Sequence, residues 1–198
     1  MEPHFESIYL DEIGFHLANS LRRVNELNAL LRALHEKRDM SVIPSIFGAI
    51  QAILVHGANV SKTLCPAPRG ATAKRDRALS RGEHLRTALG VDENDLVLDR
   101  DFRDAFEHYD ERLDEWSESS PFKNIIVNCI GSRSAIGGEA VRDEDIFRMF
   151  DPATKTLWFR GLRLDLQAYV DALSALNKKV ASRQGKLERI RFAQLPQV

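Results

Sequence analysis

The sequence has 198 residues, 43% hydrophobic residues and a formal net charge of −1, which is typical of a soluble globular domain with a proper core. The near-neutral charge excludes the overall basic composition of a dedicated nucleic-acid-binding protein, although a local basic patch is compatible with it. The two cysteines, Cys65 and Cys129, match no zinc, haem or redox spacing, so we expect reduced thiols.

The N-terminal segment is acidic and lacks the basic and apolar regions of a signal peptide. The most apolar segment, residues 42–60, is interrupted by Pro44, Gly48 and several polar residues. A membrane-spanning helix needs about 20 predominantly apolar residues. We therefore expect a cytoplasmic protein with no membrane partner.

Two long helices are predicted in the first third of the chain. Residues 6–37 carry apolar side chains every seven positions, with further apolar side chains three positions after them, which is typical of a bundle helix. The sevenfold series is Leu10, Leu17, Val24 and Leu31. Residues 45–63 are apolar on nearly all sides and therefore predict a central helix.

Two polar residues of the 45–63 helix, His56 and Asn59, are three positions apart and share a face. Buried polar groups need partners, so one hypothesis is a core histidine that is satisfied by the asparagine. The functional hypothesis is that both residues bind substrate in a cleft shared with the helix predicted at 99–116.

Residues 62–86 form the one clearly basic region, and Lys62, Arg69 and Arg75 are its candidate substrate-binding residues. Clustered lysines and arginines can bind phosphates by releasing counterions. The alternative is a solvated loop followed by a helix face without a ligand. A short helix is predicted at 83–89, ended by Gly90 as a C-terminal cap.

Residues 99–116 give the clearest amphipathic helix pattern, with Asp99 as its N-cap. The apolar face comprises Phe102, Phe106, Tyr109, Leu113 and Trp116. Arg103, Asp104 and His108 lie on the polar side. Successive helical residues turn by about 100°, so Arg103 and His108 lie about 140° apart and do not converge within one helix. Two such helices that face each other across a two-fold axis would form a composite site.

A β-containing segment is predicted at about 122–161, before a last helix that Asp165 caps and that extends to about Lys186. Within it, 146–150 and 156–160 flank a turn and predict an antiparallel hairpin. The glycine-rich stretch 131–138 lacks the ending of a phosphate loop and predicts a flexible connector. The predicted fold is mainly α: one domain over 1–198, a bundle of four main helices with a small antiparallel β-hairpin appendage before the last helix.

Arg103-Asp104-Ala105-Phe106-Glu107-His108 resembles the R-x4–6-H signature of the HEPN superfamily, whose helical bundle also fits the predicted fold. More loosely, the middle third of the chain resembles bacterial HEPN-like proteins with a similar order of segments. The wider likeness brings no known activity, but the resemblance of the Arg103–His108 motif to HEPN ribonucleases implies a homodimeric, metal-independent endoribonuclease of toxin or defence type, with no cofactor. His108 would act as general acid and base, Arg103 would hold the phosphate, and Asp104 would orient the imidazole.

The alternative to catalysis is a non-catalytic HEPN-like module that binds a nucleotide or a cognate protein partner. A third alternative is a purely structural interaction protein. The chain lacks the Walker A, HExxH and GxSxG motifs, so the sequence gives no support to an NTPase, a metalloprotease or an α/β-hydrolase.

Overall fold

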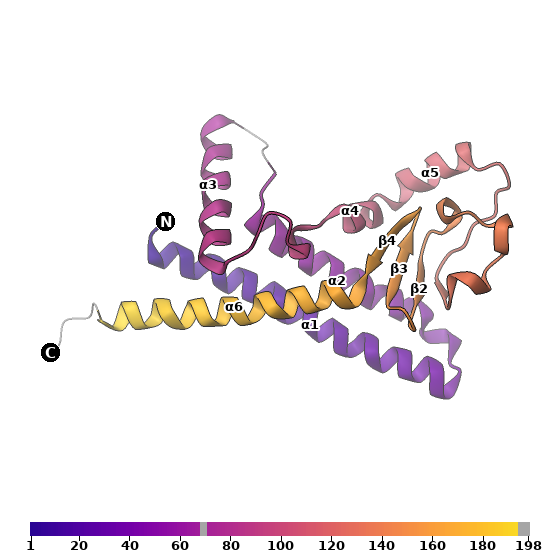
Figure 1. Ribbon diagram of the computed structural model, residues 1–198, viewed down its shortest axis with the longest axis horizontal. Helices are drawn as coiled ribbons and strands as arrows, with labels where there is room; N and C mark the ends of the chain where they lie inside the picture. Colours follow the sequence, from indigo (N-terminus) through magenta and orange to yellow (C-terminus); the bar gives the residue numbers. More distant parts are fainter. Residues whose placement is uncertain (68–70, 194–198) are drawn as a thin grey trace. The chain divides into compact units, whose positions relative to one another are not determined.

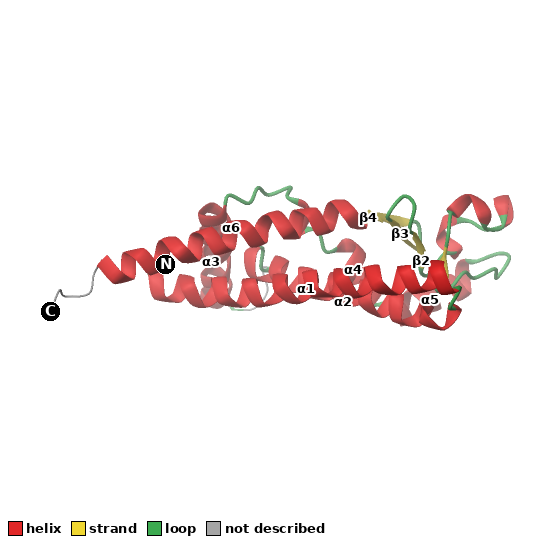
Figure 2. Cartoon of the chain, turned by 90° about the horizontal axis from the view of Figure 1, so that it is seen from below, coloured by secondary structure: helices red, strands yellow, loops and turns green. Residues whose placement is uncertain are grey.

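The computed structural model describes residues 1–67 and 71–193, with the side chains of Glu139 and of residues 190–193 excepted. The described chain is mostly helical, as the colours of Figure 2 show. Its described residues form six α-helices and one small four-stranded sheet. The prediction of a mainly α protein with a small β-containing segment is therefore confirmed.

The chain forms two compact units. Unit 1 comprises Met1–Leu21, His56–Asp99 and Asp171–Val198, and unit 2 comprises Arg22–Val55 and Arg100–Val170. The three longest helices each contribute residues to both units. They are α1 (Pro3–Lys37), α2 (Ile43–Leu64) and α6 (Leu166–Ala193).

The long helices follow the predicted periodicity. In α1, Leu10, Ile13, Leu17 and Leu27 are at most 4% exposed, and we call this series the inner α1 stripe. In α6, Leu166, Leu173, Leu176 and Val180 are buried, and the carboxylate of Asp165 accepts a hydrogen bond from the backbone N–H of Ala168 at 2.9 Å. Asp165 therefore caps α6 as predicted, although the helix continues to Ala193.

Unit 1 joins its helices through a buried carboxylate as well as through apolar packing. The side chain of Glu6 on α1 accepts hydrogen bonds from Arg183 of α6 and pairs with the Nε2 of His84, 2.9 Å away, on α3 (Thr72–Leu89). The Arg183 hydrogen bond lowers the pKa of Glu6 against the opposing effect of desolvation. Three helices of unit 1 are thus held by one ion-paired group.

The basic region forms a longer helix than predicted. α3 begins at Thr72 rather than at Glu83, so most of this region is helical and not a loop. The prediction at the other end is confirmed, because Gly90 has φ +57 and closes α3 in the left-handed conformation. Near its C-terminal end, α3 is tied to α2, because the Arg86 side chain donates a hydrogen bond to the carbonyl of Leu64, the last residue of α2, 2.6 Å away.

In unit 2, the single helix predicted at 99–116 is two helices. α4 (Asp101–Glu107) and α5 (Tyr109–Ser119) are separated at His108, whose φ −92 and ψ 40 are not helical. The aromatic face is retained across the break because ring contacts hold both helices, as with Phe106 and Tyr109 against Phe159 of β3. Asp99 does not cap α4, which starts after Arg100 without a side-chain cap.

The sheet of unit 2 is mixed rather than a simple antiparallel hairpin, and its strand order is β1-β2-β3-β4. The strands are β1 (Cys129–Ile130), β2 (Met149–Asp151), β3 (Thr156–Phe159) and β4 (Leu162–Asp165). β2 and β3 form the predicted antiparallel hairpin, with Phe150 opposite Leu157. The prediction missed two pairings: β4 is antiparallel to β3, and β1 is parallel to β2. Figure 1 shows β3 and β4 beside α4.

A buried carboxylate also fixes the β-containing segment to α5. Asp145 is fully buried and accepts hydrogen bonds from the indole of Trp116 at 2.9 Å, from Ser120 at 3.2 Å and from Arg142. Desolvation alone would raise the pKa of Asp145, but the hydrogen bonds from Arg142 and Trp116 outweigh it and lower the pKa to about 2. This carboxylate therefore remains charged inside the unit.

The segment Met40–Leu64 is, by length and composition alone, long and apolar enough to cross a membrane. The core helix of a soluble protein meets the same criterion, and side chains along α2 such as Ile46, Ile50 and Ile53 are fully buried within the protein. The segment is therefore only weak evidence for a membrane span.

Candidate functional site

A hollow of about 400 Å³ in unit 2 contains His108, and we call it the His108 hollow. Its lining comes from α4, α5 and the turn between β3 and β4. The residues are Asp101, Asp104, Ala105, His108, Arg112, Arg160 and Leu162. Asp101, Asp104, Ala105, His108 and Arg112 follow one another at helical spacing, so α4 and α5 present them on a shared face despite the break at His108.

His108 has the exposure and the partner of a reactive imidazole. Its side chain is 57% exposed, and its Nδ1 lies 3.2 Å from a carboxylate oxygen of Glu111 one turn later on α5. A carboxylate at one ring nitrogen favours the tautomer with hydrogen on that nitrogen and leaves the other available for proton transfer. Glu111, rather than the predicted Asp104, makes this contact.

Arg103 is placed differently from the prediction. Its side chain is only 14% exposed, and its guanidinium pairs with Asp104 at 2.6 Å and with Glu107. Arg103 does not belong to the lining of the His108 hollow. Two carboxylates thus neutralise the residue expected to hold phosphate, and Asp104 is engaged by Arg103 instead of orienting His108.

Two other guanidinium groups accompany His108, and the sequence analysis did not single them out. Arg112 follows His108 by four positions and could have been found from helical spacing. Arg160 comes from the turn after β3, so only the folded sheet reveals it. Both are close to Glu115, at 3.0 Å for Arg112 and 3.7 Å for Arg160. An anion in the hollow would compete with that carboxylate.

His56 and Asn59 belong to unit 1, whereas the His108 hollow belongs to unit 2. His56 is half-buried, and its Nδ1 lies 3.0 Å from the Nδ1 of His16 on α1. The other nitrogen of His16 lies 3.2 Å from Glu12. His56 therefore has a histidine partner in its own unit, as the hypothesis of a satisfied core histidine requires, although the partner is not Asn59.

The basic residues expected to bind substrate are also in unit 1. Lys62 is exposed at the end of α2, and Arg75 on α3 makes an exposed ion pair with its neighbour Asp76. Arg69 lies outside the described residues. Elsewhere in this region, Arg81 stacks on the ring of Tyr9, 5.1 Å from its centroid. Several of these cations thus have structural contacts.

The chemistry available in the His108 hollow is proton transfer and anion binding. An imidazole can donate or accept a proton, and guanidinium groups bind phosphate or carboxylate oxygens. Within residues 1–67 and 71–193, no three histidine, cysteine, aspartate or glutamate side chains are grouped closely enough to hold a metal ion.

No protein-family model, curated protein or solved structure matched this chain.

Proposed function

We propose that this chain is a HEPN-like bundle of four main helices that cleaves RNA in the cytoplasm without a metal, in a site completed by a second copy. The observation that supports it most is the constellation in the His108 hollow. An exposed imidazole is paired with Glu111 and shares the hollow with two guanidinium groups, those of Arg112 and Arg160.

The proposed reaction is transfer of the RNA phosphodiester to its own 2′-oxygen. His108 takes the proton from the ribose 2′-hydroxyl through the ring nitrogen that does not face Glu111. The 2′-oxygen attacks phosphorus, the bond to the 5′-oxygen breaks, and that oxygen leaves with a proton. The products are a 2′,3′-cyclic phosphate and a 5′-hydroxyl. Arg112 and Arg160 would stabilise the negative charge that develops on the phosphate.

A second copy is part of the proposal because one imidazole cannot serve both sides of the phosphorus at once. The attacking and leaving oxygens are on opposite sides, so the base and the acid must come from different directions. A two-fold axis supplies a second His108 without any further residue type. The proposal therefore predicts cleavage that falls more steeply than protein concentration on dilution.

An apolar stripe near the N-terminus supports self-association; it belongs to unit 1, whereas His108 belongs to unit 2, so a two-fold contact at His108 is a separate prediction. Met1, just before α1, and Phe5, Ile8 and Phe15 on α1 are 44%, 51%, 49% and 58% exposed, and we call them the outer α1 stripe. Their spacing follows a heptad seam, and Phe5 and Phe15 would meet in an antiparallel pair centred between them. Half-exposed side chains of this size offer roughly 100 Å² each, which gives about half of the ~800 Å² per partner of a standard interface. We expect a weak, concentration-dependent dimer.

The placement of Arg103 favours the alternative function, a non-catalytic HEPN-like module that binds a nucleotide or a protein partner. Arg103 is paired with Asp104 and Glu107 and does not line the hollow, so it is not free to hold phosphate there. In such a module, Arg112 and Arg160 would bind an anion without bond cleavage. The two functions differ in one measurable respect, which is the appearance of cyclic-phosphate product.

The test is incubation of the wild-type protein and of His108→Gln with single-stranded RNA in EDTA, followed by analysis of product ends. We expect the wild type to release 2′,3′-cyclic phosphates, and His108→Gln to be slower by a factor of about 10²–10⁴, which is typical of losing a general acid or base. His4→Gln is the matched control, because His4 is also exposed and lies in α1.

Equal cleavage by wild type and His108→Gln would refute the assignment of His108 and point to a contaminating nuclease. RNA binding that Arg160→Gln weakens, without cleavage by any variant, would favour the non-catalytic module. If the wild type neither binds nor cleaves the RNA, the ribonuclease function is refuted, and so is RNA binding by the non-catalytic module.

A further inference from the structure

A second hollow in unit 2, of about 650 Å³, lies where α1 ends and α2 begins, and we call it the α1-end hollow. Its apolar lining comes from both helices, from the end of β1 and from the turn between β2 and β3. The apolar side chains are Leu31, Leu34, Met40, Ile43, Ile130 and Pro152. This volume is within the range of about 300–1,000 Å³ that binds small molecules in proteins.

The apolar surface of this hollow is not required by the core of the unit. The inner α1 stripe is almost fully buried as far as Leu27, but Leu31 and Leu34, which continue the same series, are only half-buried. Met40 is 65% exposed. The sequence thus maintains an apolar series for one or two turns beyond the point where the protein itself covers it.

The charged groups of the α1-end hollow all carry, or can carry, positive charge. Arg38 and His35 line it, and no carboxylate does. In the described chain, neither side chain has a hydrogen bond or an ion pair. The neighbouring carboxylate of Asp39 accepts hydrogen bonds from the backbone and the hydroxyl of Ser41 rather than from Arg38.

The backbone at Arg38 fixes where this guanidinium starts. Arg38 follows Lys37, the last residue of α1, and its φ of +51 is the left-handed conformation that commonly ends a helix.

We propose that the α1-end hollow binds a small amphiphilic anion. The apolar chain of the ligand contacts Leu31, Leu34 and Ile43, and its carboxylate or phosphate head pairs with Arg38. Apolar contact supplies most of the affinity, and the guanidinium selects the sign of the head group. This site is separate from the His108 hollow and does not depend on RNA cleavage.

The experiment titrates the full chain with four ligands that share one alkyl chain: octanoate, octyl phosphate, octanol and octyltrimethylammonium. Binding is followed by calorimetry and by amide NMR shifts. We expect one site per chain, shifts centred on Gly131 and Ile43, and octanoate about five times tighter than octanol at low salt, the upper limit for an exposed ion pair. The cationic ligand should bind most weakly. Comparison of octanoate with octyl phosphate identifies the preferred head group.

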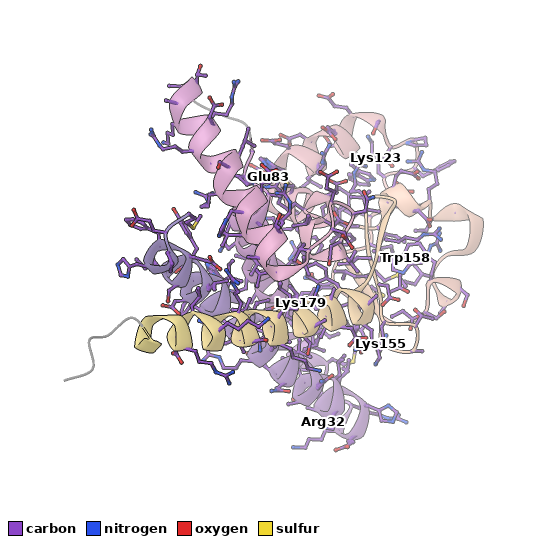
Figure 3. The ribbon with its side chains drawn as sticks, turned by 60° about the vertical axis from the view of Figure 1, so that its left-hand side comes forward. Arg32, Glu83, Lys123, Lys155, Trp158 and Lys179 are labelled. Atoms are coloured by element: carbon purple, nitrogen blue, oxygen red, sulfur yellow. The ribbon has the colours of Figure 1, made fainter. Side chains whose placement is uncertain are left out.

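Two variants separate the charge from the apolar contacts. Arg38→Gln should reduce the affinity for octanoate to that for octanol. Arg32 is an exposed residue of α1, labelled in Figure 3, and Arg32→Gln should leave the affinities for octanoate and octanol unchanged. Leu34→Asn should weaken all four ligands at least ten-fold, and its thermal unfolding would show that it is folded.

The proposal is overturned if none of the ligands binds at millimolar concentration or if octyltrimethylammonium binds as tightly as octanoate. Shifts centred outside the hollow would also overturn it, as would an unchanged preference for octanoate in Arg38→Gln.

Discussion

Asp145→Asn tests whether a buried carboxylate holds the β-containing segment of unit 2 to α5. Asparagine has nearly the same shape, so the substitution removes charge without creating a cavity. Asp145 receives hydrogen bonds from Trp116, Ser120 and both the backbone and the side chain of Arg142. An amide would bring an N–H group toward these donors, and at least one of them would lose its acceptor.

The magnitude follows from the pKa of Asp145. The folded protein lowers it from 3.8 to about 2, and each unit of pKa corresponds to about 1.4 kcal/mol. Solvent screening at Arg142, whose side chain is 40% exposed, reduces this value. We therefore expect Asp145→Asn to lower the free energy of unfolding of unit 2 by about 2 kcal/mol at pH 7.

The pH dependence has a definite sign. A carboxyl group whose pKa is lowered on folding stabilises the folded state fully above its unfolded pKa, and that stabilisation is lost as pH falls through the folded pKa. The difference between the wild type and Asp145→Asn should be constant above about pH 4.5 and should shrink steadily between pH 4 and pH 2.

Urea unfolding followed by tryptophan fluorescence is a suitable assay, because Trp116 and Trp158 are the two tryptophans of the chain and both belong to unit 2. Asp165→Asn is the matched control. Asp165 is an exposed helix cap, and asparagine caps about as well, so its effect should stay below about 0.5 kcal/mol. The reasoning would be refuted if Asp145→Asn lowered the free energy of unfolding by less than about 1 kcal/mol. It would also be refuted if the difference in this free energy between the wild type and Asp145→Asn did not change between pH 2 and pH 5.

Four further substitutions test other parts of the structure. Gly82→Ala should destabilise unit 1 by about 1–3 kcal/mol in thermal unfolding, because the new β-carbon would lie 2.6 Å from the carbonyl oxygen of Leu64. In Gly48→Ala the new β-carbon would meet no atom within 4 Å, so this substitution should stabilise α2 by about 0.5–1 kcal/mol. Glu6→Gln should lower the free energy of unfolding by about 2–3 kcal/mol at pH 7 and by progressively less below pH 4, because the pKa of Glu6 is lowered on folding. An equal decrease at pH 3 and at pH 7 would contradict this prediction. Phe15→Ser should weaken the dimer, so that the molar mass measured by light scattering stays near that of the monomer up to higher protein concentration. The same dimer in the variant and the wild type would exclude the outer α1 stripe as the interface.

Features that depend on neighbours along the chain were predictable from the sequence. The sevenfold apolar series predicted α1, and the continuous apolar surface predicted α2. Asp165 predicted the start of α6, and Gly90 predicted the end of α3. These features were predictable because helix periodicity and capping involve residues within one or two turns. The hairpin of β2 and β3 was predictable for the same reason, since a short turn joins its strands.

Features that depend on residues far apart in the chain were decided only by the tertiary structure. The parallel pairing of β1 with β2 joins segments about 20 residues apart, and no local pattern specifies it. The break at His108 is invisible to a periodic pattern, because both helices keep their aromatic rings on one cluster with Phe159. At the site, Glu111 and Arg112 are neighbours of His108 by helical spacing, and so is Glu107 of Arg103, so these pairs are local. Arg160 comes from the turn between β3 and β4, and only the folded sheet brings it to His108.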